Sequence, residues 1–133
     1  MESGHVYIAT NVFETLLALS FEDQQQGLMY IKPPVPNMAF VYNKPQVNKF
    51  WMANTPAPLD IIFCHAGEVV QICEGKPYST TVLGDDRLSD LIIELPYGTA
   101  ASSGIKLGHK AGLIKNPSIE QLKQALVRKF TIT

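Results

Sequence analysis

Three polar residues, Asn54, Asp60 and Glu94, stand in otherwise apolar surroundings in this chain of 133 residues. Asp60 directly precedes an Ile-Ile-Phe run, and Glu94 lies between an isoleucine and a leucine. A carboxylate is costly to bury unless it is hydrogen-bonded or paired with a charge. These side chains are therefore the first candidates for a binding, catalytic or structural role.

Three roles are open to these residues. Asp60 or Asn54 could hold the loop of residues 55–58 by accepting hydrogen bonds from its backbone amides, as Asx side chains commonly do. The same polar residues could form the floor of a ligand pocket, with Trp51 and the methionines as its walls. Asp60 and Glu94 could instead act as a general acid and base, although no nucleophile or metal-binding motif accompanies them.

Other reactive residues form no recognisable catalytic motif. The three histidines, His5, His65 and His109, lie in different segments and lack the i,i+4 spacing of a metal-binding helix. Cys64 and Cys73 lack CxxC spacing. Cys64 and His65 adjoin on a predicted strand, so their side chains point to opposite faces. The sequence therefore predicts no metal site, no cofactor and no covalent nucleophile.

The composition is that of a globular domain, with 46% hydrophobic and 17% charged residues and a net charge of −1. Residues 1–105 contain 5 basic and 11 acidic side chains, whereas residues 106–133 contain 6 basic and 1 acidic. The basic end could bind nucleic acid or an anionic membrane, or lie on the acidic body of the same molecule. We expect the last, because single-stranded nucleic acid is bound by basic residues beside exposed aromatics, and most aromatics here lie in the acidic body.

The sequence shows neither a transmembrane nor an export segment. No apolar run approaches the ~20 residues that a membrane-spanning helix needs. The N-terminus lacks the basic start and apolar stretch of a signal peptide. We therefore expect a soluble, cytoplasmic protein with no membrane partner.

Short apolar segments separated by turns predict a mainly β, β-rich α+β fold. We expect a compact barrel-like antiparallel sheet with one or two short helices and a C-terminal helix. Ser20 is predicted to cap a first helix that Gly27 ends, and Pro96 to begin another over residues 96–103. The predicted strands are 5–10, 13–19, 38–42, 49–52, 61–64, 69–73, 91–95 and 105–114, with a turn at 43–46.

A hairpin is predicted over residues 60–73, with its turn at Ala66 and Gly67. This turn would place Cys64 opposite Val69 and Cys73 opposite Asp60, so that the two sulfurs lie about 13 Å apart. A disulfide tolerates a Cα separation of only ~7 Å, so both cysteines are expected to be free. The more buried face of the hairpin is predicted to carry Ile61, Phe63, Val70 and Ile72.

A C-terminal helix is predicted after Asn116, where Ser118 and Gln121 have the spacing of a reciprocal capping pair. We divide the chain into a β-rich domain, residues 1–115, and a helical extension, residues 116–133, packed on it. The extension is expected to bury an apolar stripe of side chains against the barrel or against a second copy of the chain. A second copy is the one partner that the sequence suggests. Residues 130–133 could be a frayed end or an added edge strand. The apolar stripe consists of Ile119, Leu122, Ala125, Leu126 and Phe130.

Residues 13–114 resemble the domain of unknown function 192 family. The resemblance rests on the order and spacing of Gly27-Leu28-Met29, Met38-Ala39-Phe40, Phe50-Trp51-Met52 with Asn54-Thr55, Pro58-Leu59-Asp60-Ile61-Ile62-Phe63, Leu95-Pro96-Tyr97-Gly98 and Gly104-Ile105-Lys106-Leu107-Gly108. It implies a compact, largely β domain with a barrel-like core, and that family has no settled activity.

Four positions depart from the family pattern. The chain has Gln26 where arginine is usual, Asn37 for glycine, Ala53 for lysine and His109 for aspartate. The missing arginine and lysine weaken any anion-binding site proposed from the family.

These observations favour a small non-catalytic binding or interaction module, whose pocket or loop-organising residues are Trp51, Asn54, Asp60 and Glu94. One alternative is a hydrolase that uses Asp60 and Glu94. Another is a nucleic-acid accessory protein that uses the basic C-terminal helix.

Overall fold

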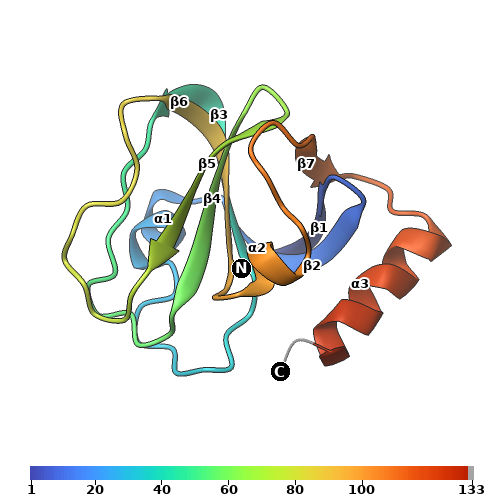
Figure 1. Ribbon diagram of the computed structural model, residues 1–133, viewed down its shortest axis with the longest axis horizontal. Coiled ribbons are helices and arrows are strands. Elements are labelled where there is room, and N and C mark those ends of the chain that lie inside the picture. The colour runs from blue at the N-terminus through green and yellow to red at the C-terminus, as the bar shows by residue number, and fades with distance from the viewer. Residues whose placement is uncertain (132–133) are drawn as a thin grey trace.

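The computed structural model describes residues 1–131, with the side chains of residues 1–128. Within these residues seven strands form one curled sheet in the order β5-β4-β6-β3-β2-β1-β7, accompanied by three short helices (Figure 1). The fold is mainly β and barrel-like, as predicted. The elements in chain order are β1 (Glu2–Ile8), β2 (Asn11–Ala18), α1 (Phe21–Gln26), β3 (Met38–Val47), β4 (Leu59–His65), β5 (Glu68–Gly75), β6 (Leu88–Pro96), α2 (Thr99–Ser102), β7 (Ala111–Ile114) and α3 (Ile119–Thr131).

The two edges of the sheet meet where β5 begins and β7 begins. The backbone N–H of Val69 donates to the carbonyl of His109 at 2.9 Å, and that of Ala111 donates to the carbonyl of Gly67 at 2.9 Å. These bonds draw the sheet into a partial barrel, which satisfies edge groups that would otherwise be exposed.

The central strands β4 and β6 are buried on both faces. In β4 the six residues from Leu59 to Cys64 are all buried, which is why this segment reads as a continuous apolar run. The side chains on one face of β4 and β6 pack in the barrel interior, in one core with Val6, Phe13 and Ile93. The other face belongs to a second core with Phe40. The second core lies on the outer side of the barrel sheet and positions the candidate site.

β2 and β3 run parallel, which corrects the prediction of an antiparallel sheet for this pair of strands. Their register pairs Leu16 with Met38 and Ala18 with Phe40. Parallel neighbours need a crossover connection, and here α1 and residues 27–37 supply it. The Ser20 cap is confirmed, since its Oγ accepts from the backbone N–H of Asp23 at 3.1 Å.

The predicted turn at residues 43–46 is wrong, because β3 continues to Val47. Its second half pairs again with β6 after a register shift, with Gln46 opposite Ser89. Asn48 ends the strand by donating from Nδ2 to the Oγ of Ser89 at 2.8 Å. Residues 49–52 are therefore not a strand, although Phe50 makes an isolated bridge with Leu83.

Two other predicted elements are shorter than expected. β7 covers only Ala111–Ile114 of the strand predicted for 105–114, and α2 covers only Thr99–Ser102 of the helix predicted for 96–103. Pro96 is the last residue of β6 rather than the start of a helix.

The β4–β5 hairpin turns at Ala66 and Gly67 as predicted, and both have the positive φ (50° and 81°) that a tight hairpin turn requires. A bulge shifts its register, because Cys64 pairs with Val69 but Phe63 pairs with Gln71. The predicted opposition of Cys73 and Asp60 is therefore wrong, and of the predicted face Ile61, Phe63 and Val70 share one core, whereas Ile72 does not. Cys73 lies opposite Ile61, and Ile72 packs on the core across the sheet from Ile61 and Phe63. Both cysteines are free.

The helix α3 has the predicted capping pair, but it turns a different face toward the barrel from the one predicted. The backbone N–H of Ser118 donates to Gln121 Oε1 at 2.9 Å, and the N–H of Gln121 donates to Ser118 Oγ at 3.1 Å. The prediction that the apolar stripe packs on the barrel is wrong, because only Ala125 of its described members is buried. Phe130 has no described side chain, and residues 132–133 lie outside the described part. The exposed members are Ile119, Leu122 and Leu126.

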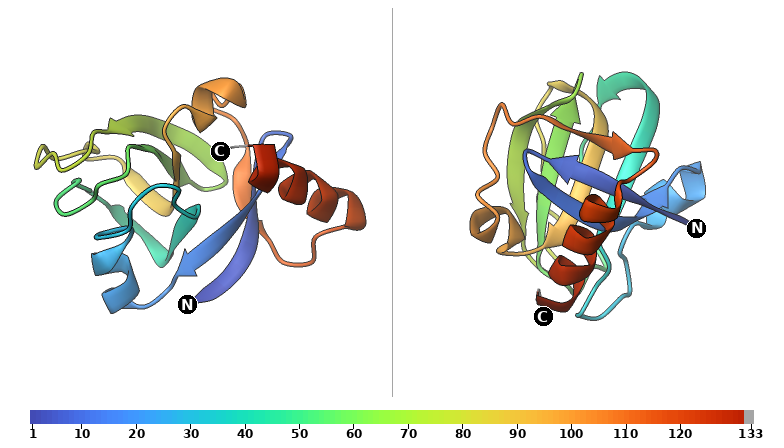
Figure 2. Two further views of the ribbon diagram at one scale, coloured as in Figure 1. Left: turned by 90° about the horizontal axis from the view of Figure 1, so that it is seen from below. Right: turned by 90° about the vertical axis from the view of Figure 1, so that its right-hand side faces the viewer.

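Polar contacts place α3 against β2 (Figure 2). Gln124 Nε2 donates to the carbonyl of Thr10 at 2.9 Å. Arg128 donates to Asn11 Oδ1 and to Ser103 Oγ, and its guanidinium lies 5.1 Å from the ring centroid of Phe13. A guanidinium stacked on an aromatic ring favours this face over the aliphatic stripe.

Among the described residues, no helix is both long and apolar enough to cross a membrane.

Candidate functional site

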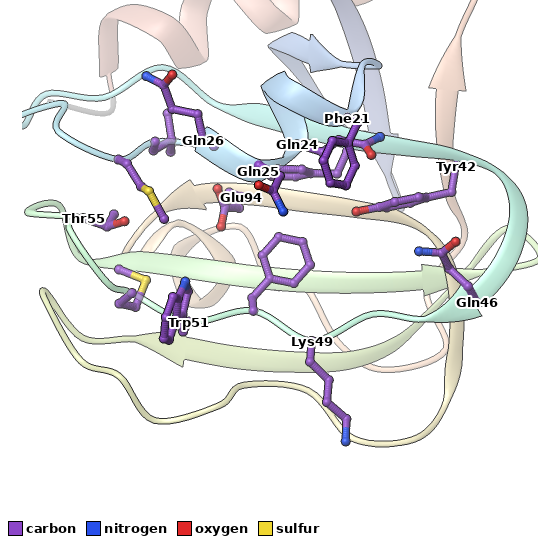
Figure 3. A pocket seen from close by; sticks show the side chains of 16 residues that line it. Phe21, Gln24, Gln25, Gln26, Tyr42, Gln46, Lys49, Trp51, Thr55 and Glu94 are labelled. Atoms are coloured by element: carbon purple, nitrogen blue, oxygen red, sulfur yellow. The ribbon is translucent and has the colours of Figure 1, made fainter.

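A cavity of about 550 Å³ lies between α1, the first half of β3 and residues 49–52, with Glu94 of β6 among its lining residues (Figure 3). Its size is within the range of small-molecule pockets. The lining combines aromatic and methionine side chains with uncharged amides. These residues are Phe21, Gln24, Gln25, Gln26, Gly27, Leu28, Met29, Phe40, Tyr42, Gln46, Lys49, Phe50, Trp51, Met52, Thr55 and Glu94.

Glu94 is the one acidic residue of the cavity. β6 places it beside Met38 of β3 and Ile61 of β4, in the middle of the outer core. Its side chain is only 4% exposed. No described group donates a hydrogen bond to its carboxyl, and burial raises the pKa of Glu94 to about 8. The floor of the cavity is thus a carboxylic acid that stays protonated near neutral pH.

Aromatic rings form the walls around this acid. The rings of Phe40 and Phe50 meet edge to face at 5.0 Å between centroids, and Phe50 meets Phe63 in the same way at 5.7 Å. Trp51 and Phe21 are 53% and 74% exposed, so their rings lie at the mouth. Such edge-to-face packing fixes the inner rings in place.

The segment that carries Trp51 is held by a distant loop. The backbones of Phe50 and Leu83 exchange two hydrogen bonds, at 2.9 and 2.7 Å. The N–H of Met52 donates to the carbonyl of Ser79 at 2.9 Å. This anchoring positions a wall of the cavity without regular secondary structure.

α1 covers the opposite side of the cavity. Gln24 Nε2 donates to the carbonyls of Ala18 at 3.1 Å and Val41 at 3.0 Å, which ties the helix to β2 and β3. Gly27 ends the helix at a φ of 52°, where a side chain would be strained. An added Cβ there would lie 3.3 Å from the Phe40 ring and 3.9 Å from Glu94 Oε1. The glycine therefore leaves room directly above the acid.

Two further titratable groups line the cavity. Burial, followed by the proximity of Glu94, raises the pKa of the Tyr42 phenol, so it stays neutral. Lys49 is paired with Asp86 at 3.0 Å and points away from Glu94 (Figure 3). Neither group compensates an ionised Glu94.

Asp60 lies on the opposite face of the sheet from Glu94. It pairs with Leu95, whereas Glu94 pairs with Ile61, and successive side chains of a strand alternate between faces. Its Oδ2 accepts from the backbone N–H of Gly98 at 3.0 Å and of Ala100 at 2.9 Å. Burial raises the pKa of Asp60, and these two hydrogen bonds oppose the shift.

Asp60 therefore holds the turn into α2. The role considered from the sequence, holding the loop of residues 55–58, is not the one that its hydrogen bonds show. Hydrogen bonds within and around that loop hold it instead, including one from the backbone N–H of Thr55 to the carbonyl of Met52 at 3.1 Å. Asn54 has a positive φ of 57°, and its carbonyl accepts from the N–H of Tyr30 at 2.7 Å. Its role is thus in the backbone, beside the cavity.

The structure places two of the four predicted site residues, Trp51 and Glu94, in one cavity. It adds Phe21, Tyr42 and the three glutamines of α1, which the sequence analysis did not single out. An unusual run of uncharged polar residues in a helix was the only signal for the glutamines. Tyr42 lies at the end of the strand predicted for 38–42, but its place beside Glu94 depends on the pairing of β3 with β6, which no local signal reveals.

The cysteine thiols are poorly suited to nucleophilic chemistry. Burial, with a contribution from Asp90, raises the pKa of the Cys64 thiol to about 12. Burial also raises the pKa of Cys73. Among the described residues, no three His, Cys, Asp or Glu side chains gather in a way that would hold a metal ion.

Residues 5–113 match the model of the DUF192 family, described as an uncharacterized ACR. A crystal structure of a protein of unknown function from Novosphingobium aromaticivorans DSM 12444 is similar, with 33% identity and a TM-score of 0.77 over 83% of this chain and 84% of that one. A crystal structure of a candidate transcription regulator from Sinorhizobium meliloti 1021 is similar at 25% identity, with a TM-score of 0.79 over 84% of this chain and 94% of that one. No curated protein matches. The chain belongs to the DUF192 family.

Proposed function

We propose that the protein is a non-catalytic binding module, and that it holds a small ligand in the cavity above Glu94. The observation that carries this proposal is a buried carboxyl without a hydrogen-bond partner among the described residues, at the floor of a cavity of about 550 Å³. Leaving a buried polar group unpaired costs about 1–3 kcal/mol. A ligand that pairs with this group recovers that free energy on binding.

The surroundings of Glu94 support binding rather than acid–base catalysis. Aromatic walls with a few fixed polar groups are typical of ligand pockets. The hydrolase alternative needs Asp60 and Glu94 on one substrate, but the two carboxyls project from opposite faces of the sheet. The two carboxyl groups therefore cannot act together on one substrate, and a binding role has the stronger support.

Fragment screening by NMR tests the proposal. Trp51 is the only tryptophan of the chain and lies at the cavity mouth, so its indole N–H signal reports directly on occupancy. We expect some fragments to shift this signal, and to bind more weakly to Glu94→Gln than to the charge-matched surface variant Glu120→Gln. A library that leaves Trp51 unmoved, or turnover in a broad hydrolase screen, would contradict the proposal.

Nucleic-acid binding through α3 is the second candidate, because one similar structure is that of a candidate transcription regulator. Against it, Arg128 is already engaged with Asn11, Ser103 and Phe13. Phosphate contacts would make binding to DNA or RNA fall steeply with salt. We expect no such salt-dependent binding in a titration. The cytoplasmic location expected from the sequence stays a prediction.

A further inference from the structure

We infer that the occupant of the cavity is an organic cation, a protonated or quaternary amine, for which Glu94 is the counter-ion and the surrounding rings are the cage. This inference rests on the proposed function and adds the chemical class of the ligand to it.

The cavity carries an uncompensated acid. The titratable residues of the cavity are Tyr42, Lys49 and Glu94. Tyr42 is neutral, and Lys49 is committed to Asp86 at the rim. An ionised Glu94 thus has no counter-charge among the described residues, and an ionised carboxylate is very costly to bury alone. A cationic ligand supplies the missing charge, whereas an anionic ligand would add a second one of the same sign.

Aromatic rings surround the same space. Phe21, Phe40, Tyr42, Phe50 and Trp51 all line the cavity. The faces of aromatic rings carry partial negative charge and attract ammonium groups, most strongly when water is excluded. A cation between these rings and Glu94 is therefore attracted from several sides at once.

A neutral polar ligand fits the cavity less well. The Gln24 amide already donates both of its N–H groups to the carbonyls of Ala18 and Val41. Gln25 and Gln26 belong to the covering helix α1 and carry no charge. The floor itself offers one carboxyl, which gains most from a partner of opposite charge.

Binding of a cation is coupled to the release of a proton. The free site holds a protonated Glu94, because burial raises its pKa to about 8. The cation enters, the carboxyl O–H bond breaks, and the proton leaves to solvent, so the net charge of the complex equals that of the free protein. Affinity for a cation should therefore increase with pH until Glu94 is ionised in the free protein.

A pair of isosteric probes tests the inference: choline, which is cationic, and 3,3-dimethylbutan-1-ol, its neutral analogue. Each is titrated against the Trp51 indole signal at about pH 6 and about pH 8. We expect choline to bind at least about tenfold more tightly at the higher pH, and more tightly than the alcohol there. Glu94→Gln should lose both the preference for choline and the pH dependence, while Glu120→Gln should keep them.

A second variant distinguishes the loss of a cation contact from a general disturbance of the cavity. Phe21 is exposed at the mouth, so Phe21→Leu should fold normally and weaken choline roughly two- to five-fold while changing the alcohol less. Equal binding of both probes, unaffected by Glu94→Gln, would overturn the cation inference and leave the binding function standing. Absence of choline binding would also overturn it, and the fragment screen would then decide the binding function separately.

Discussion

Glu94 is the residue whose environment is most unusual, and its protonation should govern stability. Its pKa in the folded protein is about 8, against an ordinary value of 4.5. Between these values the unfolded chain releases a proton that the folded protein keeps, so stability falls as pH rises through this window. Below the ordinary value both states are protonated and the effect vanishes.

Glu94→Gln should therefore change the pH dependence of unfolding. The glutamine resembles the protonated acid, so the variant should gain roughly 3 kcal/mol relative to wild type between about pH 4 and about pH 7. Urea unfolding at the two pH values measures this difference. Parallel stability curves for the two proteins would show that Glu94 ionises normally in the fold.

Asp60 should behave differently, because its carboxyl has partners. Asp60→Asn replaces a charge-assisted acceptor for the N–H groups of Gly98 and Ala100, and should cost about 1–3 kcal/mol of unfolding free energy. The matched control is Asp86→Asn, whose exposed pair with Lys49 should matter by less than about 1 kcal/mol. A control loss as large as that of Asp60→Asn would contradict the assigned role.

At the level of single residues, the sequence identified Glu94 and Asp60 through their apolar neighbours. It could not separate their roles, because that depends on which strands flank them. Leu95 and Ile61 reveal the opposite faces only once the register of β4 and β6 is known. The contribution of Tyr42 to the site depends on the same long-range pairing.

At the level of elements, local signals were reliable where the determinants are local. The caps at Ser20 and Ser118 and the turn at Ala66-Gly67 all appear as predicted. The bulge beside Cys64 was not predicted, because no turn chemistry marks it. The orientation of α3 was missed because its docking depends on Arg128 meeting Phe13, more than a hundred residues earlier.

Arg128→Ala should therefore loosen α3. The change removes hydrogen bonds to Asn11 and Ser103 and a ring contact, and should cost about 1–3 kcal/mol. Lys123→Ala, on the exposed side of the same helix, is the control. Thermal melts of both variants and of a chain ending at Lys115 compare the effect. If both variants and the shortened chain melt at the same temperature as wild type, the docking of α3 contributes nothing to stability.

At the level of the whole molecule, the curled sheet creates two cores, and the outer one opens to the cavity above Glu94. The sequence predicted the barrel-like sheet but not the parallel pair β2–β3, because a crossover through α1 leaves no local trace. That crossover is what sets the glutamines over Glu94. Self-association through the exposed Ile119, Leu122 and Leu126 remains a prediction, which sedimentation can check.

The most direct measurement is an NMR titration of the Glu94 side-chain carboxyl carbon, with and without choline. We expect a midpoint near pH 8 for the free protein, as burial without a partner requires, and a clear shift to lower pH when choline is bound. A midpoint close to the ordinary value of 4.5, unmoved by choline, would contradict the claim that Glu94 is the unpaired floor of a binding site.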